Sequence, residues 1–124
     1  MDDARRFLPL SAQQFQILLA LTDEPRHGYG IILDVEARTA GAVRLGTGTL
    51  YTAIAGLLDD GLVAEARPPA AGDIDERRKY YRVTALGRRV LEAETGRMDA
   101  LVRDARRKGV RPATARPAWS RSKS

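Results

Sequence analysis

The amino-acid sequence predicts a mainly helical domain with a small β-hairpin, and three observations lead to this fold class. Residues 11–58 contain three short stretches with the apolar period of amphipathic helices. Two runs of alternating residues, 62–66 and 80–83, predict short strands on either side of a polar loop. A longer helical stretch follows at residues 85–108. The chain has 124 residues, so we expect one small domain with a modest core.

Composition excludes several classes of function. The chain has no cysteine, which rules out disulfides, thiolate metal sites and cysteine nucleophiles. No carboxylate pair is spaced to form a metal site or a catalytic dyad with His27, the single histidine, so we expect no enzyme, no metal and no cofactor. We expect His27 to fix the start of a helix instead. No apolar run approaches the ~20 residues of a membrane span and the first residues do not resemble a signal peptide, so we expect a cytoplasmic protein without a membrane partner.

Charge is distributed unevenly along the chain. The net charge is +5, but residues 1–76 hold 6 Lys and Arg against 12 Asp and Glu, whereas residues 77–124 hold 15 against 4. The basic part begins abruptly at Arg77, Arg78 and Lys79. This asymmetry favours a polyanionic partner, most simply nucleic acid, although surface charge can also serve solubility.

The first half of the chain predicts a helix-turn-helix. Residues 1–10 are expected to form a loose arm. A first helix should run from Ser11, a good N-cap, to Thr22, and a second from His27 to about Thr39. The buried stripe expected for the first helix comprises Phe15, Leu18, Leu19 and Thr22. Tight connections join these helices to a third one, which is the layout of a helix-turn-helix unit.

The third helix is the most informative stretch. We expect Thr47 to cap it and the helix to start near Gly48, with a buried stripe of Leu50, Ile54, Leu57 and Leu58. The opposite face carries only small residues and hydroxyls: Gly48, Thr49, Thr52, Ala55 and Gly56. Such a face can come close to another surface. Two interpretations of that surface stay open: a nucleic-acid groove, and the protein's own neighbouring elements.

The hairpin and the three helices together predict a winged helix-turn-helix that binds DNA. Thr49 and Thr52 would face the major groove, while Lys and Arg of the wing neutralise phosphates. Tyr51 is either a core tyrosine or one that holds its hydroxyl out to a phosphate. Tyr29 lies at a helix start, where anions are attracted. The DNA-binding residues we predict are Tyr29, Thr47, Gly48, Thr49, Tyr51, Thr52, Arg77, Arg78, Lys79 and Tyr80.

The long helix at residues 85–108, capped by Thr84, exceeds what a core of this size can cover. About 24 residues span ~36 Å, so the far half needs another partner, and self-association is the economical answer. Glu94 and Gly96 interrupt its apolar stripe and argue against a continuous coiled coil. The dimerisation residues we predict are Leu91, Met98, Leu101, Val102 and Ala105. Residues 109–124 are expected to form a disordered basic tail.

Three motifs, in order and at matching spacing, give the chain a resemblance to the PadR family of bacterial transcriptional regulators. They are residues 25–31 (PRHGYGI), residues 48–54 (GTLYTAI) with residues 57–63 (LLDDGLV), and residues 77–84 (RRKYYRVT) with Gly87. The resemblance implies a homodimeric winged-helix repressor, with the C-terminal helix as dimer interface and often with a small aromatic or drug-like effector. It also places Thr49, Tyr51 and residues 78–80 on positions that the family uses at DNA.

Two departures from the family accompany the resemblance. Thr52 stands where the family commonly has proline, and Ala55 and Gly56 replace a basic pair that would contact phosphates. We therefore expect a homodimeric repressor that binds a palindromic DNA operator. Its parts would be an arm at 1–10, a winged helix-turn-helix domain at 11–84, a dimerisation helix at 85–108 and a tail at 109–124. The alternative is a winged-helix protein–protein interaction module with an acidic partner.

Overall fold

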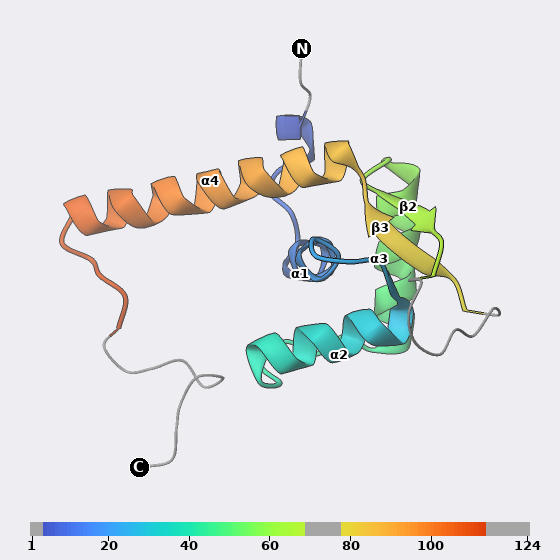
Figure 1. Cartoon of the computed structure of the whole chain (residues 1–124). Helices are drawn as coiled ribbons and strands as arrows, with labels where there is room; N and C mark the ends of the chain where they lie inside the picture. Colours follow the sequence, from blue (N-terminus) through green and yellow to red (C-terminus); the bar gives the residue numbers. More distant parts are fainter. Residues whose placement is uncertain (1–3, 69–77, 114–124) are drawn as a thin grey trace.

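The computed structural model describes residues 4–68 and 78–113 (Figure 1). It is mainly helical, with a small antiparallel sheet and a long C-terminal helix, as predicted. The elements in chain order are a 3₁₀ helix η1 (Ala4–Phe7), α1 (Ala12–Ala20), β1 (Arg26–His27), α2 (Gly28–Thr39), α3 (Thr47–Asp59), β2 (Val63–Ala66), β3 (Tyr80–Val83) and α4 (Ala85–Arg107). In Figure 1, α1 lies between α4 and α2, and α3 stands beside the sheet.

The core is built from one face of each of the first three helices and from the first half of α4. Leu50, Ile54 and Leu57 of α3 are buried, which confirms the stripe predicted for this helix, with Leu58 only half-buried. The stripe predicted for α1 was partly wrong, because Ile17 is fully buried while Phe15, Leu19 and Thr22 are only half-buried. Since α1 packs against α2, α3 and α4, it buries more than one side, and a single-stripe pattern cannot describe it. Leu18 is fully buried, as predicted.

Side-chain caps start two of the helices as the sequence predicts. The Ser11 hydroxyl accepts from the backbone N–H of Gln14, and the Gln14 side chain accepts from the N–H of Ser11, which forms a capping box. Thr84 accepts from the N–H of Gly87 at the start of α4. The prediction that Thr47 caps α3 was wrong: Gly46 is the extended N-cap residue and makes no side-chain bond, so Thr47 is already helical.

The sheet has three strands rather than the two that were predicted. Its order is β1-β3-β2, both pairs are antiparallel, and β2 begins at Val63 instead of Leu62. Strand β1 has only two residues, which is too short for an alternating pattern to reveal it. Its register sets Arg26 opposite Tyr81 and His27 opposite Tyr80. This pairing fixes the start of α2, which follows β1 directly, against β3.

The N-terminal segment is docked, so the prediction of a loose arm is wrong for residues 4–10. Ala4 is buried, and η1 packs along α4. The backbone N–H of Leu10 donates to Oε2 of Glu94 at 3.0 Å, and the guanidinium of Arg97 donates to both carboxylate oxygens at 2.6 and 2.9 Å. The pKa of Glu94 lies below its ordinary value. The hydrogen bond from Arg97 is the main cause and the bond from Leu10 adds to it, while burial acts in the opposite direction. Glu94 therefore ties the arm to α4 instead of merely interrupting an apolar stripe.

Helix α4 leaves the core about halfway along its length. Val90 and Leu91 are buried among the other helices, and Gly87 lies so close to the carbonyl oxygen of Leu62 that a side chain would collide with it. Leu91, predicted as a dimerisation residue, belongs to the subunit's own core. Beyond Glu94, Leu101 and Val102 are exposed.

The helix ends at Arg107, with Lys108 as its C-cap, and residues 109–113 follow without regular structure. The rest of the predicted tail, residues 114–124, lies outside the described residues. Within the described part of the chain, no helix is both long and apolar enough to cross a bilayer.

Candidate nucleic-acid interface

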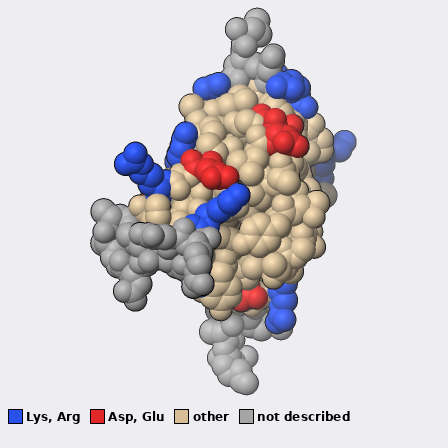
Figure 2. Space-filling view, turned by 90° about the vertical axis from the view of Figure 1, so that its right-hand side faces the viewer, with Lys and Arg blue, Asp and Glu red and all other residues tan. Residues whose placement is uncertain are grey.

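Helix α3 presents an uncharged ridge to solvent, formed by Gly48, Thr49, Thr52, Ala55 and Gly56. All five of these residues are exposed, and the only charged residue of the helix is Asp59 in its last turn. Figure 2 views the molecule from the side of α3 and the sheet, where a broad uncharged area is bordered by Asp and Glu side chains as well as by Lys and Arg. The α3 ridge can therefore approach a partner without removing a long charged side chain from water.

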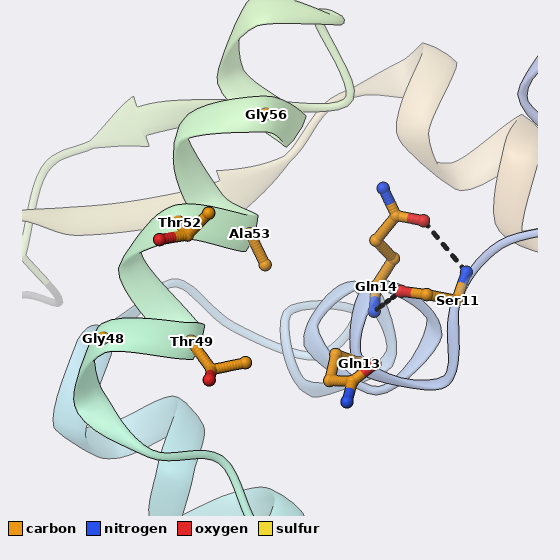
Figure 3. A pocket seen from close by; sticks show the side chains of 8 residues that line it. All are labelled: Ser11, Gln13, Gln14, Gly48, Thr49, Thr52, Ala53 and Gly56. Atoms are coloured by element: carbon orange, nitrogen blue, oxygen red, sulfur yellow. Dashed lines mark hydrogen bonds between the residues drawn. The ribbon is translucent and has the colours of Figure 1, made fainter.

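A neutral hollow of about 690 Å³ lies on one side of the α3 ridge, between α3 and the start of α1 (Figure 3). Thr49 and Thr52 line it from α3, and Gln13 lines it from α1. Its lining consists of hydroxyls, amides and small residues: Ser11, Gln13, Gln14, Gly48, Thr49, Thr52, Ala53 and Gly56. Sequence reasoning did not find Gln13, because only the packing of α1 against α3 brings the two helices together.

A second hollow, which we call the basic cup, lies on the other side of α3 and measures about 400 Å³. Cationic and phenolic side chains from α2, α3 and the start of β3 converge in it. Its lining residues are His27, Gly28, Tyr29, Tyr51, Arg78, Lys79 and Tyr81. Four residues predicted to bind DNA, Tyr29, Tyr51, Arg78 and Lys79, are thus brought together. The two sides of α3 differ in chemistry, one being neutral and the other cationic.

Close packing of α2 on α3 shapes the basic cup. A side-chain carbon at Gly28 would lie 2.8 Å from Cζ of Tyr51 and 3.2 Å from Cδ2 of Leu50, so only glycine allows the Tyr51 ring to lie against the start of α2. Tyr51 keeps about half of its surface exposed, and Tyr29 more than half. One part of the Tyr51 side chain therefore packs against the start of α2, and the other part is exposed to solvent.

His27 stands where α2, β1 and β3 meet. Its Nδ1 accepts from the backbone N–H of Gly30 at 3.0 Å, which confirms that His27 fixes the start of α2. Its ring stacks edge-on with Tyr80, with centroids 5.2 Å apart and planes at 81°. Arg78 Nη1 lies 2.7 Å from His27 Nε2. Tyr80 is buried and packs behind His27, and its contact with DNA stays a prediction.

The phenol of Tyr81 forms the floor of the basic cup. Burial raises its pKa, and nearby Tyr51 and Glu65 raise it further. Tyr81 therefore stays neutral and can donate a hydrogen bond at ordinary pH. Lys79 lies 3.6 Å from Glu65, but both side chains are largely exposed, so this ion pair is weak. Arg77, also predicted to bind DNA, lies outside the described residues.

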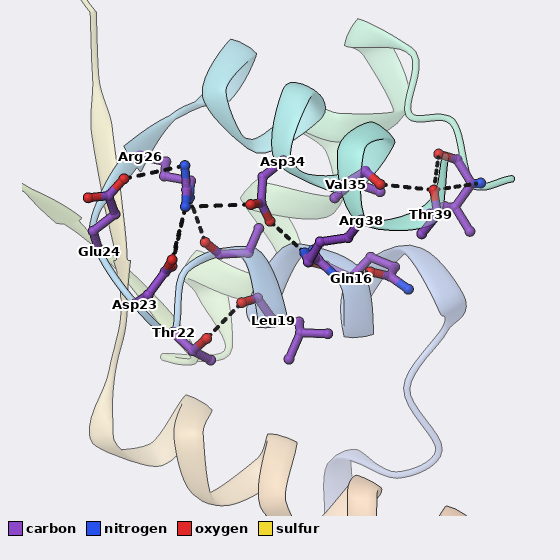
Figure 4. A network of polar contacts seen from close by, with 12 residues as sticks. Gln16, Leu19, Thr22, Asp23, Glu24, Arg26, Asp34, Val35, Arg38 and Thr39 are labelled. Carbon is purple, nitrogen blue, oxygen red and sulfur yellow. Dashed lines mark hydrogen bonds and ion pairs between the residues drawn. The ribbon is translucent and has the colours of Figure 1, made fainter. Parts of the chain in front are cut away.

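A polar network links α1, β1 and α2 (Figure 4). Arg26 donates from Nε to the carbonyl oxygen of Ala20 at 2.8 Å and lies 3.5 Å from Asp34. Asp34 also accepts from Arg38 at 2.7 Å, and Arg38 donates to the side chain of Gln16 in α1 at 2.8 Å. These bonds tie β1 to the end of α1 and to the middle of α2, and the last turn of α2 to the middle of α1.

Comparisons with known proteins agree with this geometry. The model of the transcriptional regulator PadR-like family matches residues 17–93. A PadR-like transcription factor from Bacteroides fragilis is 27% identical, with a TM-score of 0.61 over 77% of this chain and 87% of its own. RosR of H. salinarum, in a structure described as a complex, is 25% identical, with a TM-score of 0.64 over 86% and 90% of the two chains. A PadR family regulator from Clostridium difficile shares the fold at 20% identity, with a TM-score of 0.62 over 79% and 98%. No curated protein sequence matches significantly.

Proposed function

The chain belongs to the PadR-like family of transcriptional regulators, a family of DNA-binding proteins and not of enzymes, and we propose that it is a homodimeric repressor. Each subunit would insert α3 into the major groove of one half of a palindromic operator. The observation that carries this proposal is the exposed, uncharged α3 ridge with cationic side chains gathered on one side of it.

The α3 ridge suits groove recognition by its shape and by its hydroxyl groups. The major groove of B-DNA is about 12 Å wide and admits a helix whose side chains reach base edges. Small residues let the helix lie deep, and the hydroxyls of Thr49 and Thr52 can donate to or accept from bases. Thr47, which is exposed in the first turn, lies directly before the ridge in the chain.

Contacts to the phosphates would come from the basic cup, chiefly from Arg78 and Lys79. Phosphate contacts set register and orientation but carry no base sequence. Changing Arg78 and Lys79 to alanine should therefore lower affinity similarly on all duplexes. The salt dependence should weaken as well, since log affinity changes by about 0.9 per neutralised phosphate for each tenfold change in salt.

Dimerisation would use the second half of α4, where Leu101 and Val102 are exposed and Met98 and Ala105 are half-buried. Two-fold symmetry would place the half-sites about one helical turn, ~34–36 Å, or a multiple of it apart. A small aromatic or drug-like effector enters the proposal only as the family resemblance implies it. Both hollows beside α3 are open to solvent, and we assign neither to an effector.

The experiment that tests the proposal is selection of bound genomic fragments followed by footprinting. Wild-type protein should protect a palindrome, and the double variant Thr49→Ala, Thr52→Ala should lose discrimination between that site and unrelated duplex. Ala37→Ser, at an exposed uncharged position of α2 that lines neither hollow beside α3, is the control and should bind like wild type. Wild-type binding without any sequence preference would contradict the proposal and favour a protein interaction module with an acidic partner. Full discrimination by the double variant would show that the α3 ridge does not read bases.

A further inference from the structure

We propose that the neutral hollow between α1 and α3 receives the sugar-phosphate backbone of one DNA strand, and that the side-chain amide of Gln13 donates a hydrogen bond to a phosphate of that strand. The inference rests on the proposed function, because it takes α3 to lie in the major groove. It adds a residue of α1 and an uncharged contact that the proposed function does not need, so it can fail while the proposed function stands.

The first step is the position of the neutral hollow. Four of its lining residues, Gly48, Thr49, Thr52 and Gly56, are also residues of the α3 ridge. The start of α1 forms the opposite side, with Gln13 in its lining (Figure 3). The hollow is open to solvent, so a duplex that lies on the α3 ridge also covers the hollow.

The second step is the width of the groove. The major groove of B-DNA is about 12 Å wide, and an α-helix with its side chains is about 10–12 Å across. A helix in the groove therefore fills it, and an element packed beside that helix meets the sugar-phosphate backbone at the edge of the groove. Helix α1 packs against α3, and its start borders the hollow. The basic cup lies on the other side of α3 and would meet the opposite strand.

The third step is the choice of side chain. The hydroxyl of Ser11 and the side-chain oxygen of Gln14 accept from each other's backbone N–H groups in the capping box. Gln13 is exposed, and its side chain makes no hydrogen bond within the described part of the chain. Its amide has two N–H donors, and glutamine is one of the side chains that donate to phosphate oxygens at DNA. Gln13 is therefore a donor that a strand in the hollow meets without breaking a bond of the subunit.

The fourth step is the lack of charge in the hollow. None of its lining residues, all of which belong to the described ranges, is charged. A neutral amide leaves the phosphate its negative charge, so the contact releases no counterion and adds nothing to the salt dependence of binding. Lys79 on the side of the basic cup would neutralise a phosphate and add to that dependence. The two strands would therefore be bound by contacts that respond differently to salt.

Salt titrations test this difference. Gln13→Ala should bind operator and unrelated duplex about 10-fold more weakly, as for the loss of a hydrogen bond to a charged group, with the salt slope and melting temperature of wild type. Gln13→Lys should steepen the slope of log affinity against log salt by about 0.9, because its charge neutralises the phosphate, and Lys79→Ala should flatten the slope by a similar amount. Ala37→Lys is the matched control. It adds the same charge at an exposed position of α2 that lines neither hollow, and it should change the slope much less.

Duplexes that carry a single uncharged methylphosphonate identify the strand. Replacement at one position of each half-site should weaken binding of wild-type protein much more than binding of Gln13→Ala, and it should weaken Gln13→Lys most. Lys79→Ala should stay sensitive at this position and lose its sensitivity at a position on the opposite strand. If Gln13→Ala and Lys79→Ala lost sensitivity at the same position, the two residues would bind one strand and the assignment would be wrong.

The outcomes are distinguishable from those of the proposed function. Wild-type affinity in Gln13→Ala together with an unchanged slope in Gln13→Lys would overturn the inference, even for a protein that recognises an operator. A loss by Gln13→Ala confined to one base pair of the operator would mean that the amide reads a base edge, as glutamine reads adenine, and would overturn the assignment to the backbone. A wild-type protein without operator preference would overturn the proposed function, while the slopes on unrelated duplex would still show whether Gln13 meets a phosphate.

Discussion

The two halves of α4 share one continuous helix but differ in what surrounds them. In residues 85–94 the helix buries Val90, Leu91 and Glu94 against the arm and the other helices. In residues 95–107 the apolar side chains of Leu101 and Val102 are exposed. The first half is part of the core of the chain, whereas the second half exposes apolar side chains.

The charged side chains of the two halves also differ in how deeply they are buried. Glu94 is 2% exposed and accepts three hydrogen bonds within the subunit. Beyond it, Asp99 pairs with Arg103 at 3.7 Å and Asp104 with Arg107 at 3.0 Å, and all four side chains are mostly exposed. Exposed pairs of this kind stabilise a helix only weakly. The exposed side chains of Leu101 and Val102 are the surface for which we propose a second copy of the chain as partner.

The largest effect on subunit stability is expected from the first half. Leu91→Ala should lower the free energy of unfolding by about 2–5 kcal/mol, because it leaves a cavity in the core. Chemical denaturation followed by circular dichroism measures this. Glu92→Ala, an exposed neighbour in the same helical turn, is the control and should change it by less than about 0.5 kcal/mol. A small effect of Leu91→Ala would mean that Leu91 is not a core residue in solution.

The next largest effect should appear in the second half, on association and not on folding. The double variant Leu101→Glu, Val102→Glu places two charges on the exposed apolar patch and should weaken dimerisation about 100-fold or more, or roughly 2.7 kcal/mol. Analytical ultracentrifugation measures the mass, and circular dichroism should report an unchanged helix content. If the double variant remains a dimer at micromolar concentration, the interface lies elsewhere.

A smaller effect is expected where the halves meet, at Glu94. Its pKa is lowered in the folded protein, so its contribution to stability is present above its unfolded pKa of about 4.3 and is lost as the pH falls through the folded value. Glu94→Gln should cost roughly 1–3 kcal/mol at pH 7, because the bonds to Arg97 and Leu10 lose their charge. Denaturation at a series of pH values should show a flatter acid limb for Glu94→Gln. Equal acid limbs would contradict the assignment.

The smallest effect is expected from the exposed ion pairs of the second half. Asp99→Asn should change the free energy of unfolding by about 0.3–0.5 kcal/mol at low salt and by less at high salt. Thermal melts at two salt concentrations measure it. A loss of more than about 1 kcal/mol would mean that Asp99 contacts a second subunit.

Much of the fold could be predicted because its signals are local. The period of Leu50, Ile54 and Leu57 indicates which side of α3 is buried, and hydroxyls at Ser11 and Thr84 mark the starts of α1 and α4. Alternating residues at 80–83 give the bounds of β3, which are observed as predicted. Each of these features depends on residues within a few positions of one another.

The features that escaped prediction depend on distant parts of the chain. Strand β1 exists because β3 lies beside it, and the arm is ordered because Glu94, 84 residues after Leu10, accepts its backbone N–H. Leu91 and Leu101 look alike on the helix, yet the first is 5% and the second 56% exposed. In the same way, His27 was predicted as a cap, and only the folded chain brings Arg78 to its other nitrogen.

The contact between Glu94 and Leu10 also shapes the surface of α4 beside the core. It lies where α4 leaves the core, and the arm that it fastens borders a hollow with Ala93, Gly96 and Ala100 on the same helix. A second chain that landed on this stretch would meet the arm and the helix as one prepared platform. If the proposed dimer forms over this stretch, the arm would be part of its interface.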